Sequence, residues 1–161
     1  MGTESIVLAE LTGVVEDLAG VGRRRNPKRM GELSEAALLW KAQSLGFGVS
    51  KPWGDSERYD FVVNAGGRLW RVQLKSTAVV HARGYEVQPI YSVYSDVYGR
   101  SKAGYSADEI DVLVVHIRPR EVWYVLPVEA LVSCKNLRFY PDIACKQARW
   151  ESYREAWWMM G

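Results

Sequence analysis

The sequence has few of the residues that build disulfide scaffolds and metal clusters. Its 161 residues include two cysteines, Cys134 and Cys145, and two histidines, His81 and His116. Two cysteines argue against a disulfide-stabilised secreted domain, and such isolated histidines argue against a zinc site. No stretch approaches the roughly 20 apolar residues that span a bilayer, and no glycine-rich phosphate loop precedes a helix. We therefore expect neither a membrane protein nor a nucleotide hydrolase.

The N-terminal segment differs in charge from the rest of the chain. Residues 1–22 contain four acidic side chains and no basic one. A secretory signal begins with basic residues, so we expect a cytoplasmic protein. Five basic residues follow within seven positions: Arg23, Arg24, Arg25, Lys28 and Arg29. This block is either a phosphate-binding segment or a solvated linker. We expect residues 1–30 to form a helix with this basic linker, and residues 31–161 to form one domain.

The spacing of apolar residues predicts an α/β fold in which a mixed β-sheet is flanked by helices. Helical spacing covers residues 4–18, 31–45 and 149–160. Strand patterns cover residues 47–50, 58–64, 68–77, 85–94, 111–117 and 122–126, with one or two helical turns over 127–132. Residues 64–67 are expected to be a hairpin turn with 64 and 67 paired, and residues 95–106 a loop.

One strand carries an ordered row of polar side chains. Alternation over residues 69–75 places Trp70, Val72 and Leu74 on a core face, and Arg71, Gln73 and Lys75 on the opposite face. The hairpin brings Asp60 to the level of Gln73 and Lys75. An acid, an amide and an ammonium are therefore expected to converge, although a simple ion pair between Asp60 and Lys75 would explain two of them.

A second acid comes from the helix predicted over residues 31–45. Glu35 shares its stripe with apolar residues, and a carboxylate on a core-facing stripe is costly unless it is paired or binds a metal. Either a metal role or a structural pair with Arg58 or Arg71 fits this position.

These residues together resemble a known family. The motifs are Gly31 followed four residues later by Glu35, then Tyr59-Asp60-Phe61-Val62-Val63, then Arg71-Val72-Gln73-Leu74-Lys75-Ser76. The pattern resembles the PD-(D/E)XK nuclease superfamily. It looks most like the branch that contains group I intron-associated homing endonucleases, and it is similar to archaeal Holliday junction resolvases. The resemblance runs from about residue 31 to residue 132 and implies a restriction-endonuclease-like core.

The resemblance implies a metal-dependent phosphodiesterase site with catalytic residues Glu35, Asp60, Gln73 and Lys75. Asp60, the Gln73 side-chain oxygen, the Leu74 carbonyl and Glu35 would hold Mg²⁺, with Mn²⁺ as an alternative. Lys75 would position or help deprotonate the attacking water. Two positions depart from the family pattern: Tyr59 stands where a proline is usual, and Gln73 replaces the usual acid. Active members with Gln are known in the intron-associated branch, but the change removes a negative charge from the metal site.

The residues between 83 and 105 interleave basic and tyrosine side chains. Arg83, Arg100 and Lys102 alternate with Tyr85, Tyr91, Tyr94, Tyr98 and Tyr105. Such a segment either contacts phosphates and bases or is an ordinary edge strand with buried tyrosines.

The expected function is cleavage of double-stranded DNA by a homo-oligomer, a dimer or tetramer. A non-catalytic DNA-binding module and a structure-specific junction resolvase are the alternatives.

Overall fold

The computed structural model describes residues 26–161, so the helix expected over 4–18 and Arg23, Arg24 and Arg25 lie outside the described residues. The described chain begins with helix α2 (Pro27–Ser44), which ends before Gly46, a glycine with a positive φ of 77°. The boundary predicted at residue 30 stays a prediction, and α2 continues past it. No helix in this part of the chain is both long and apolar enough to cross a membrane.

A five-stranded mixed sheet forms the centre of the domain, in the order β1-β2-β3-β8-β9. Its strands are β1 (Gly48–Ser50), β2 (Phe61–Ala65), β3 (Arg68–Thr77), β8 (Val112–Ile117) and β9 (Val122–Pro127). β3 and β8 are parallel and the other neighbours are antiparallel. All six residues of β8 are buried, as an apolar strand covered on both faces requires. The predicted mixed sheet is confirmed.

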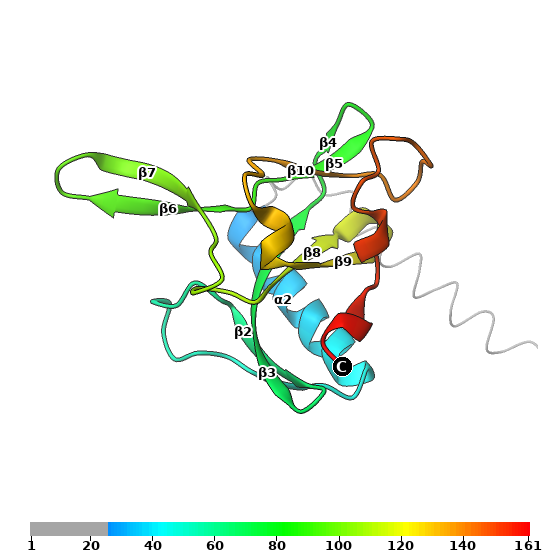
Figure 1. Ribbon diagram of the computed structural model, residues 1–161, viewed down its shortest axis with the longest axis horizontal. Helices are drawn as coiled ribbons and strands as arrows, with labels where there is room; N and C mark the ends of the chain where they lie inside the picture. Colours follow the sequence, from blue (N-terminus) through cyan, green and yellow to red (C-terminus); the bar gives the residue numbers. More distant parts are fainter. Residues whose placement is uncertain (1–25) are drawn as a thin grey trace, which may run out of the picture. The chain divides into compact units, whose positions relative to one another are not determined.

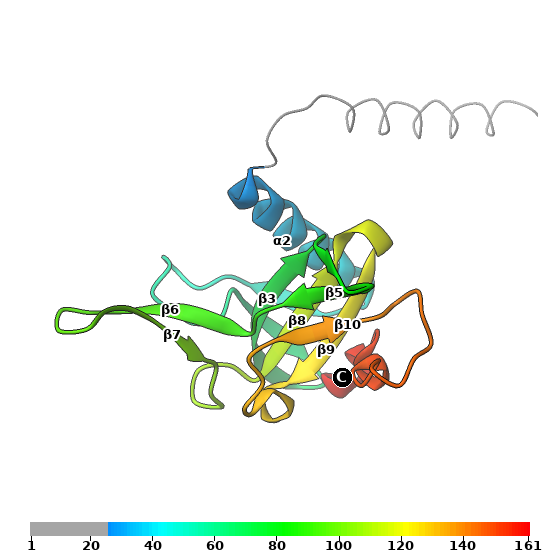
Figure 2. The same ribbon diagram turned by 90° about the horizontal axis from the view of Figure 1, so that it is seen from above.

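Different elements cover the two faces of this sheet (Figures 1 and 2). On one face, Leu38 of α2 packs with Val72 and Leu74 of β3 and with Trp157 near the C-terminus. On the other face lies a second, three-stranded sheet in the order β10-β5-β4. Its strands are β4 (Val80–His81), β5 (Gly84–Val87) and β10 (Leu137–Phe139). A small sheet therefore takes the place of a helix on that face, within the described residues.

A buried histidine attaches α2 to the central sheet. His116 of β8 is 3% exposed, and its Nδ1 lies 3.3 Å from Oγ of Ser34 on the helix. Its ring stacks on Trp123 of β9, with centroids 3.9 Å apart and planes 1° from parallel. The helix that carries Glu35 is thus fixed to the strand beside β3.

The residues expected to form a loop over 95–106 instead contain a strand. β6 (Ile90–Ser95) and β7 (Gly99–Gly104) pair as an antiparallel hairpin that projects from the domain (Figure 1). We call this hairpin the arm, and the paired residues Ile90 and Gly104 its foot. The strand pattern over 85–94 divides into β5 and β6, and the break falls where Pro89 was expected to interrupt it.

The helix predicted over residues 149–160 is wrong. The aromatic spacing is helical, but the segment folds as two 3₁₀ turns, Glu151–Tyr153 and Trp157–Met159. Between them Arg154 is extended and bridges to Tyr124, and Glu155 has a left-handed φ of 48°. The stripe of Trp150 and Trp157 is nevertheless buried, as its apolar character predicts. Three further short turns lie at Arg118–Arg120 and Val128–Leu131, and around Gly66 and Gly67.

The β2–β3 turn differs by one residue from the predicted pairing. Ala65 pairs with Arg68, so Gly66 and Gly67 alone form the turn, with φ of 57° and 73°. A Cβ at position 66 would lie 2.8 Å from the carbonyl oxygen of Met160, whereas a Cβ at position 67 meets nothing within 4 Å.

These two glycines provide a matched test of the fold. Gly67→Ala is expected to lower the free energy of unfolding by about 1 kcal/mol, the cost of a left-handed non-glycine residue. Gly66→Ala adds a backbone clash and is expected to cost about 2–3 kcal/mol. Urea unfolding of both variants measures the difference. Equal losses would show that the C-terminal segment does not pack on this turn.

Candidate active site

The hairpin places Asp60 directly beside the polar row of β3. Asp60 precedes β2, and its backbone N–H donates to the Val72 carbonyl at 2.9 Å. Its Oδ2 accepts from the Leu74 backbone N–H at 2.9 Å and from Nε2 of Gln73 at 2.7 Å. The predicted convergence of Asp60 with Gln73 is therefore present, and it needs no β-bulge.

Gln73 is buried, with 8% of its surface exposed, and its amide faces two acceptors. Besides Asp60, its Nε2 donates to the Leu74 carbonyl at 3.1 Å. An amide that meets a carboxylate and a carbonyl must present its N–H₂ group to them, because its own oxygen cannot donate. Turning the amide over would bring its oxygen to the same position.

Lys75 lies beside Asp60 and Gln73, but its ammonium contacts other residues. Its Nζ donates to the Ile90 carbonyl at 3.2 Å and lies 5.5 Å from the centroid of the Tyr105 ring. Within residues 26–161, no ion pair of 4.0 Å or less joins Lys75 to Asp60, so the simple ion pair is not formed. Burial lowers the pKa of Lys75, and the charge of Asp60 opposes that shift.

Glu35 reaches the site from α2. Its Oε2 accepts from Nζ of Lys51 at 2.5 Å, so the expected alternative of a pair with Arg58 or Arg71 is wrong. Arg58 pairs instead with Glu109 at 3.8 Å, and Arg71 with Asp111 at 3.0 Å. Burial raises the pKa of Asp60, and the negative charge of Glu35 adds to that rise.

The donor set fits a hard divalent cation. Asp60 and Glu35 supply carboxylates, and Leu74 and Gln73 supply carbonyl oxygens, the ligand types that Mg²⁺ takes while it keeps several waters. No group of three or more His, Cys, Asp or Glu side chains with metal-binding geometry occurs in the described residues. The neutral oxygens of Gln73 and Leu74 therefore matter to the fit.

Several residues around the site carry no local sequence signal. Lys51 lies in the loop after β1, and its ammonium also sits 5.2 Å from the Phe61 ring centroid. Tyr91 and Tyr105, expected among possible DNA contacts, lie instead beside Lys75 and Arg58, with rings 5.2 Å apart. Tyr85 is buried in the core. Contacts between segments far apart in the chain create these neighbours.

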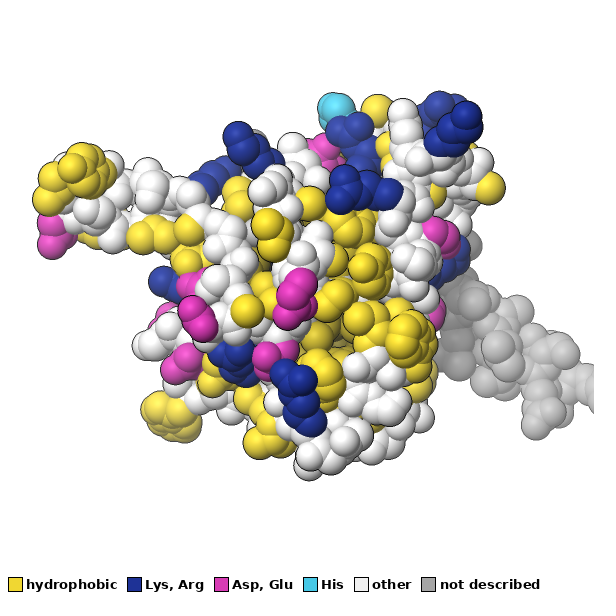
Figure 3. Space-filling model, in the orientation of Figure 1, with side chains coloured by type: hydrophobic (Ala, Val, Ile, Leu, Met, Phe, Trp, Pro, Cys, Tyr) yellow, Lys and Arg dark blue, Asp and Glu magenta, His cyan; other side chains and the backbone are white. Residues whose placement is uncertain are grey.

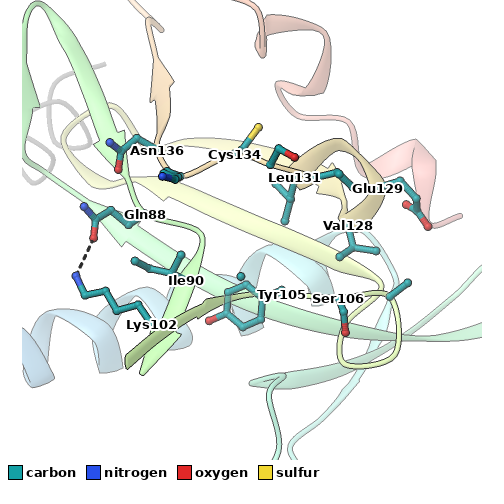
Figure 4. A pocket seen from close by; sticks show the side chains of 15 residues that line it. Gln88, Ile90, Lys102, Tyr105, Ser106, Val128, Glu129, Leu131, Cys134 and Asn136 are labelled. Carbon is teal, nitrogen blue, oxygen red and sulfur yellow. Dashed lines mark hydrogen bonds between the residues drawn. The ribbon is translucent and has the colours of Figure 1, made fainter. Parts of the chain in front are cut away.

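A separate pocket of about 1030 Å³ lies on another side of the arm's foot (Figure 4). Ile90, Tyr105, Val128 and Leu131 give it an apolar lining, and Lys102 and Gln88 stand at one end. None of the four expected catalytic residues lines it. Its link to the candidate site is through Ile90 and Tyr105, which contact Lys75.

The expected DNA-contacting residues lie on three separate elements. Arg83 has a φ of 68° in the exposed turn between β4 and β5. Arg100 and Lys102 are exposed on one face of the arm, opposite Tyr94 and Ser92 of β6. Lys28 and Arg29 are exposed in the first turn of α2. Figure 3 shows Lys and Arg side chains along the upper edge of the domain, from the arm toward the β4–β5 hairpin.

The electrostatics of Asp60 predict a stability effect that does not depend on activity. Burial raises the pKa of Asp60 above its ordinary value of 3.8. The folded protein thus favours the protonated form, and its stability falls as pH rises from 3.8 through the higher folded pKa. Asp60→Asn is expected to raise Tm by a few degrees at pH 7.5 and less at pH 4. Asp96→Asn, on the exposed arm, is the control. An equal or lower Tm for Asp60→Asn at pH 7.5 would contradict this account.

The comparisons with known proteins agree with the geometry. No curated protein sequence matches the chain. A solved structure of a bacterial homing endonuclease, I-Ssp6803I, is similar to it with a TM-score of 0.72 and 28% sequence identity, over 82% of this chain and 90% of that one. The sequence profile described as PD-(D/E)XK endonuclease matches residues 25–160. That match spans most of the chain, and the protein therefore belongs to the PD-(D/E)XK endonuclease family.

Proposed function

We propose that this protein is a divalent-metal-dependent endonuclease that hydrolyses phosphodiester bonds of double-stranded DNA. One observation supports this most directly: Asp60, Gln73 and the Leu74 carbonyl meet at one point, with Lys75 beside them. Members of this family generally use divalent metal ions. The similar solved protein is a homing endonuclease, and we propose a homing-type activity for this chain as well.

Asp60, the Gln73 side-chain oxygen, the Leu74 carbonyl and Glu35 are the residues that would hold Mg²⁺, or Mn²⁺ in its place. The cation would act as a Lewis acid on the scissile phosphate and lower the pKa of a bound water. For Gln73 to take part, its amide must turn over, because Nε2 now faces the two other oxygens. Glu35 must likewise share its carboxylate with Lys51.

Lys75 supplies a positive charge next to Asp60 and Gln73, and no ion pair with Asp60 neutralises this charge. One of its three N–H bonds is used by the Ile90 carbonyl, which leaves donors for a phosphate oxygen and an attacking water. In a half-buried site such a charge stabilises the pentacoordinate phosphate more strongly than it would in water. The chain's own contribution is therefore orientation of the water and electrostatic stabilisation.

Two substitutions test this assignment. Lys75→Met and Asp60→Asn are each expected to reduce plasmid cleavage in Mg²⁺ by about 100-fold or more, the scale of losing one preorganised electrostatic group. Lys146→Met, an exposed lysine in the segment before Trp150, is the matched control and should cleave as wild type does.

The outcomes separate the alternatives. Cleavage that persists in both variants would refute the assigned site. A wild-type protein that binds DNA but does not cut it in Mg²⁺ or Mn²⁺ would be a non-catalytic binding module, the alternative that Gln73 favours. Preference for a four-way junction over a linear duplex would identify a junction resolvase.

DNA contacts are proposed for the arm and for basic residues on other segments of the chain. A two-stranded β-ribbon fits the major groove, and Arg100 and Lys102 share one face of this one. Arg83, Lys28 and Arg29 are further exposed charges, and the block of Arg23, Arg24 and Arg25 would add phosphate contacts.

Cutting both strands is simplest for a symmetric dimer or tetramer. We propose that the protein acts in the cytoplasm, with residues 31–161 as its nuclease domain.

The arm's role is tested by the salt dependence of binding. Arg100→Ala and Lys102→Ala are each expected to weaken duplex binding and to reduce the slope of log K against log salt by about 1, the value for one lost phosphate contact. Lys146→Ala, with the same loss of charge elsewhere on the surface, should change neither quantity. An unchanged slope in the arm variants would remove the arm from the DNA interface.

A further inference from the structure

Lys75 makes two contacts where the arm joins the domain, one with the first residue of β6 and one with the residue directly after β7. Ile90, whose carbonyl accepts from Lys75, is the first residue of β6. It pairs with Gly104, the last residue of β7, and Tyr105 follows directly. The Tyr105 ring centroid is 5.5 Å from the ammonium, within the range of a cation–π interaction. The position of Lys75 thus depends on where the arm leaves the domain.

Tyr105 is itself held by a stack of side chains. Its ring lies 5.2 Å from that of Tyr91 on β6, and the Arg58 guanidinium lies 4.2 Å from the Tyr91 ring centroid. The Tyr91 hydroxyl donates to Glu109 at 2.5 Å, and Glu109 also accepts from the Ser106 backbone at 3.0 Å. These contacts fix Tyr105 from both neighbouring segments.

Tyr105 acts on Lys75 as a neutral ring. Burial and the nearby charge of Asp60 raise the pKa of its hydroxyl far above its ordinary value, so it stays protonated. The remaining attraction is between the ammonium and the negative face of the ring. This attraction holds the Lys75 ammonium in place and leaves its charge uncompensated. An ion pair with Asp60 would instead neutralise that charge.

We propose that Tyr105 is a positioning residue for Lys75. Together with the Ile90 carbonyl, Tyr105 makes the position of the Lys75 ammonium depend on the foot of the arm. This inference rests on the proposed endonuclease function. Displacement of a charged group by about 1 Å in an active site can cost on the order of 100-fold in rate. The arm that is proposed to contact DNA is then the element that holds Lys75.

Tyr105 packs against the edge of the core and also lines a pocket. Figure 4 shows Tyr105 and Ile90 among the side chains that line the 1030 Å³ pocket. A smaller side chain at position 105 therefore enlarges an existing hollow instead of opening a new cavity. Substitutions here are suited to testing position and charge.

The test compares side chains with and without an aromatic face. Tyr105→Phe keeps the ring, and Tyr105→Leu removes it. Single-turnover cleavage at saturating duplex is expected to remain within about twofold of wild type for Tyr105→Phe and to fall about tenfold for Tyr105→Leu. The dissociation constant for duplex, measured in EDTA, should change in neither. Tyr153→Leu, which removes another half-buried ring, is the control and should leave the rate unchanged.

Two further measurements separate positioning from folding. Trifluorophenylalanine at position 105 has nearly the shape of phenylalanine but a weakened negative face, so it should cut more slowly than Tyr105→Phe. In a Lys75→Met background, which has no cation to face the ring, the ratio between the Tyr105→Phe and Tyr105→Leu rates should shrink, because the two residues act together. Equal rates for Phe and Leu at position 105, or effects that simply add, would overturn the proposal.

A readout without activity distinguishes this inference from the proposed function. In selectively labelled protein, ring current should shift the Lys75 Hε protons upfield in wild type and Tyr105→Phe, and Tyr105→Leu should reverse the shift. An unchanged shift overturns the positioning role even if the protein cleaves DNA. A wild type that does not cleave overturns the proposed function, and the chemical shifts still decide whether Tyr105 holds Lys75.

Discussion

Two hydrogen bonds to a single oxygen, Oδ2 of Asp60, hold together the strand ends around which the candidate site is built. β2 begins only at Phe61, so the Leu74 N–H of β3 has passed the end of its partner strand, and the Asp60 carboxylate accepts from it instead. The same oxygen accepts from the Gln73 amide. Because the carboxyl group is largely removed from water, desolvation still raises its pKa, and the bond from the Leu74 N–H offsets part of that shift. The backbone and the candidate site are thus stabilised by the same contact.

The polar row of β3 is ordered by three different segments of the chain. Asp111, just before β8, accepts from both the backbone N–H and the guanidinium of Arg71. Asp60 holds Gln73, and the foot of the arm holds Lys75. The row also stands beside β8, which is parallel to β3 and buried at every residue. Precise placement of polar side chains requires such support from elements that cannot easily move.

The predictions that succeeded depend on local patterns. Alternation over β3 specifies which side chains share a face, and two consecutive glycines fix the turn that brings Asp60 alongside. The failures come from contacts that no short segment reveals. β7 is rich in glycine and polar residues and is a strand only because β6 pairs with it. The aromatic spacing near the C-terminus looks helical, but Arg154 is drawn into a bridge with Tyr124. Glu35 is paired with Lys51 from a loop and Lys75 with Ile90 from the first position of β6, and the periodicity of α2 and β3 carries no information about either partner.

The Gln73 side-chain amide can turn either its N–H₂ group or its oxygen toward the candidate site. A carboxylate at this position would face Asp60 as a like charge whenever no cation lay between them, and the buried pair would destabilise the fold. An amide avoids that repulsion, since its N–H₂ satisfies the Asp60 and Leu74 oxygens directly. Rotation about one terminal bond then exchanges a donor for an acceptor without moving the backbone. An amide at position 73 therefore satisfies the Asp60 and Leu74 oxygens in the folded protein without any cation.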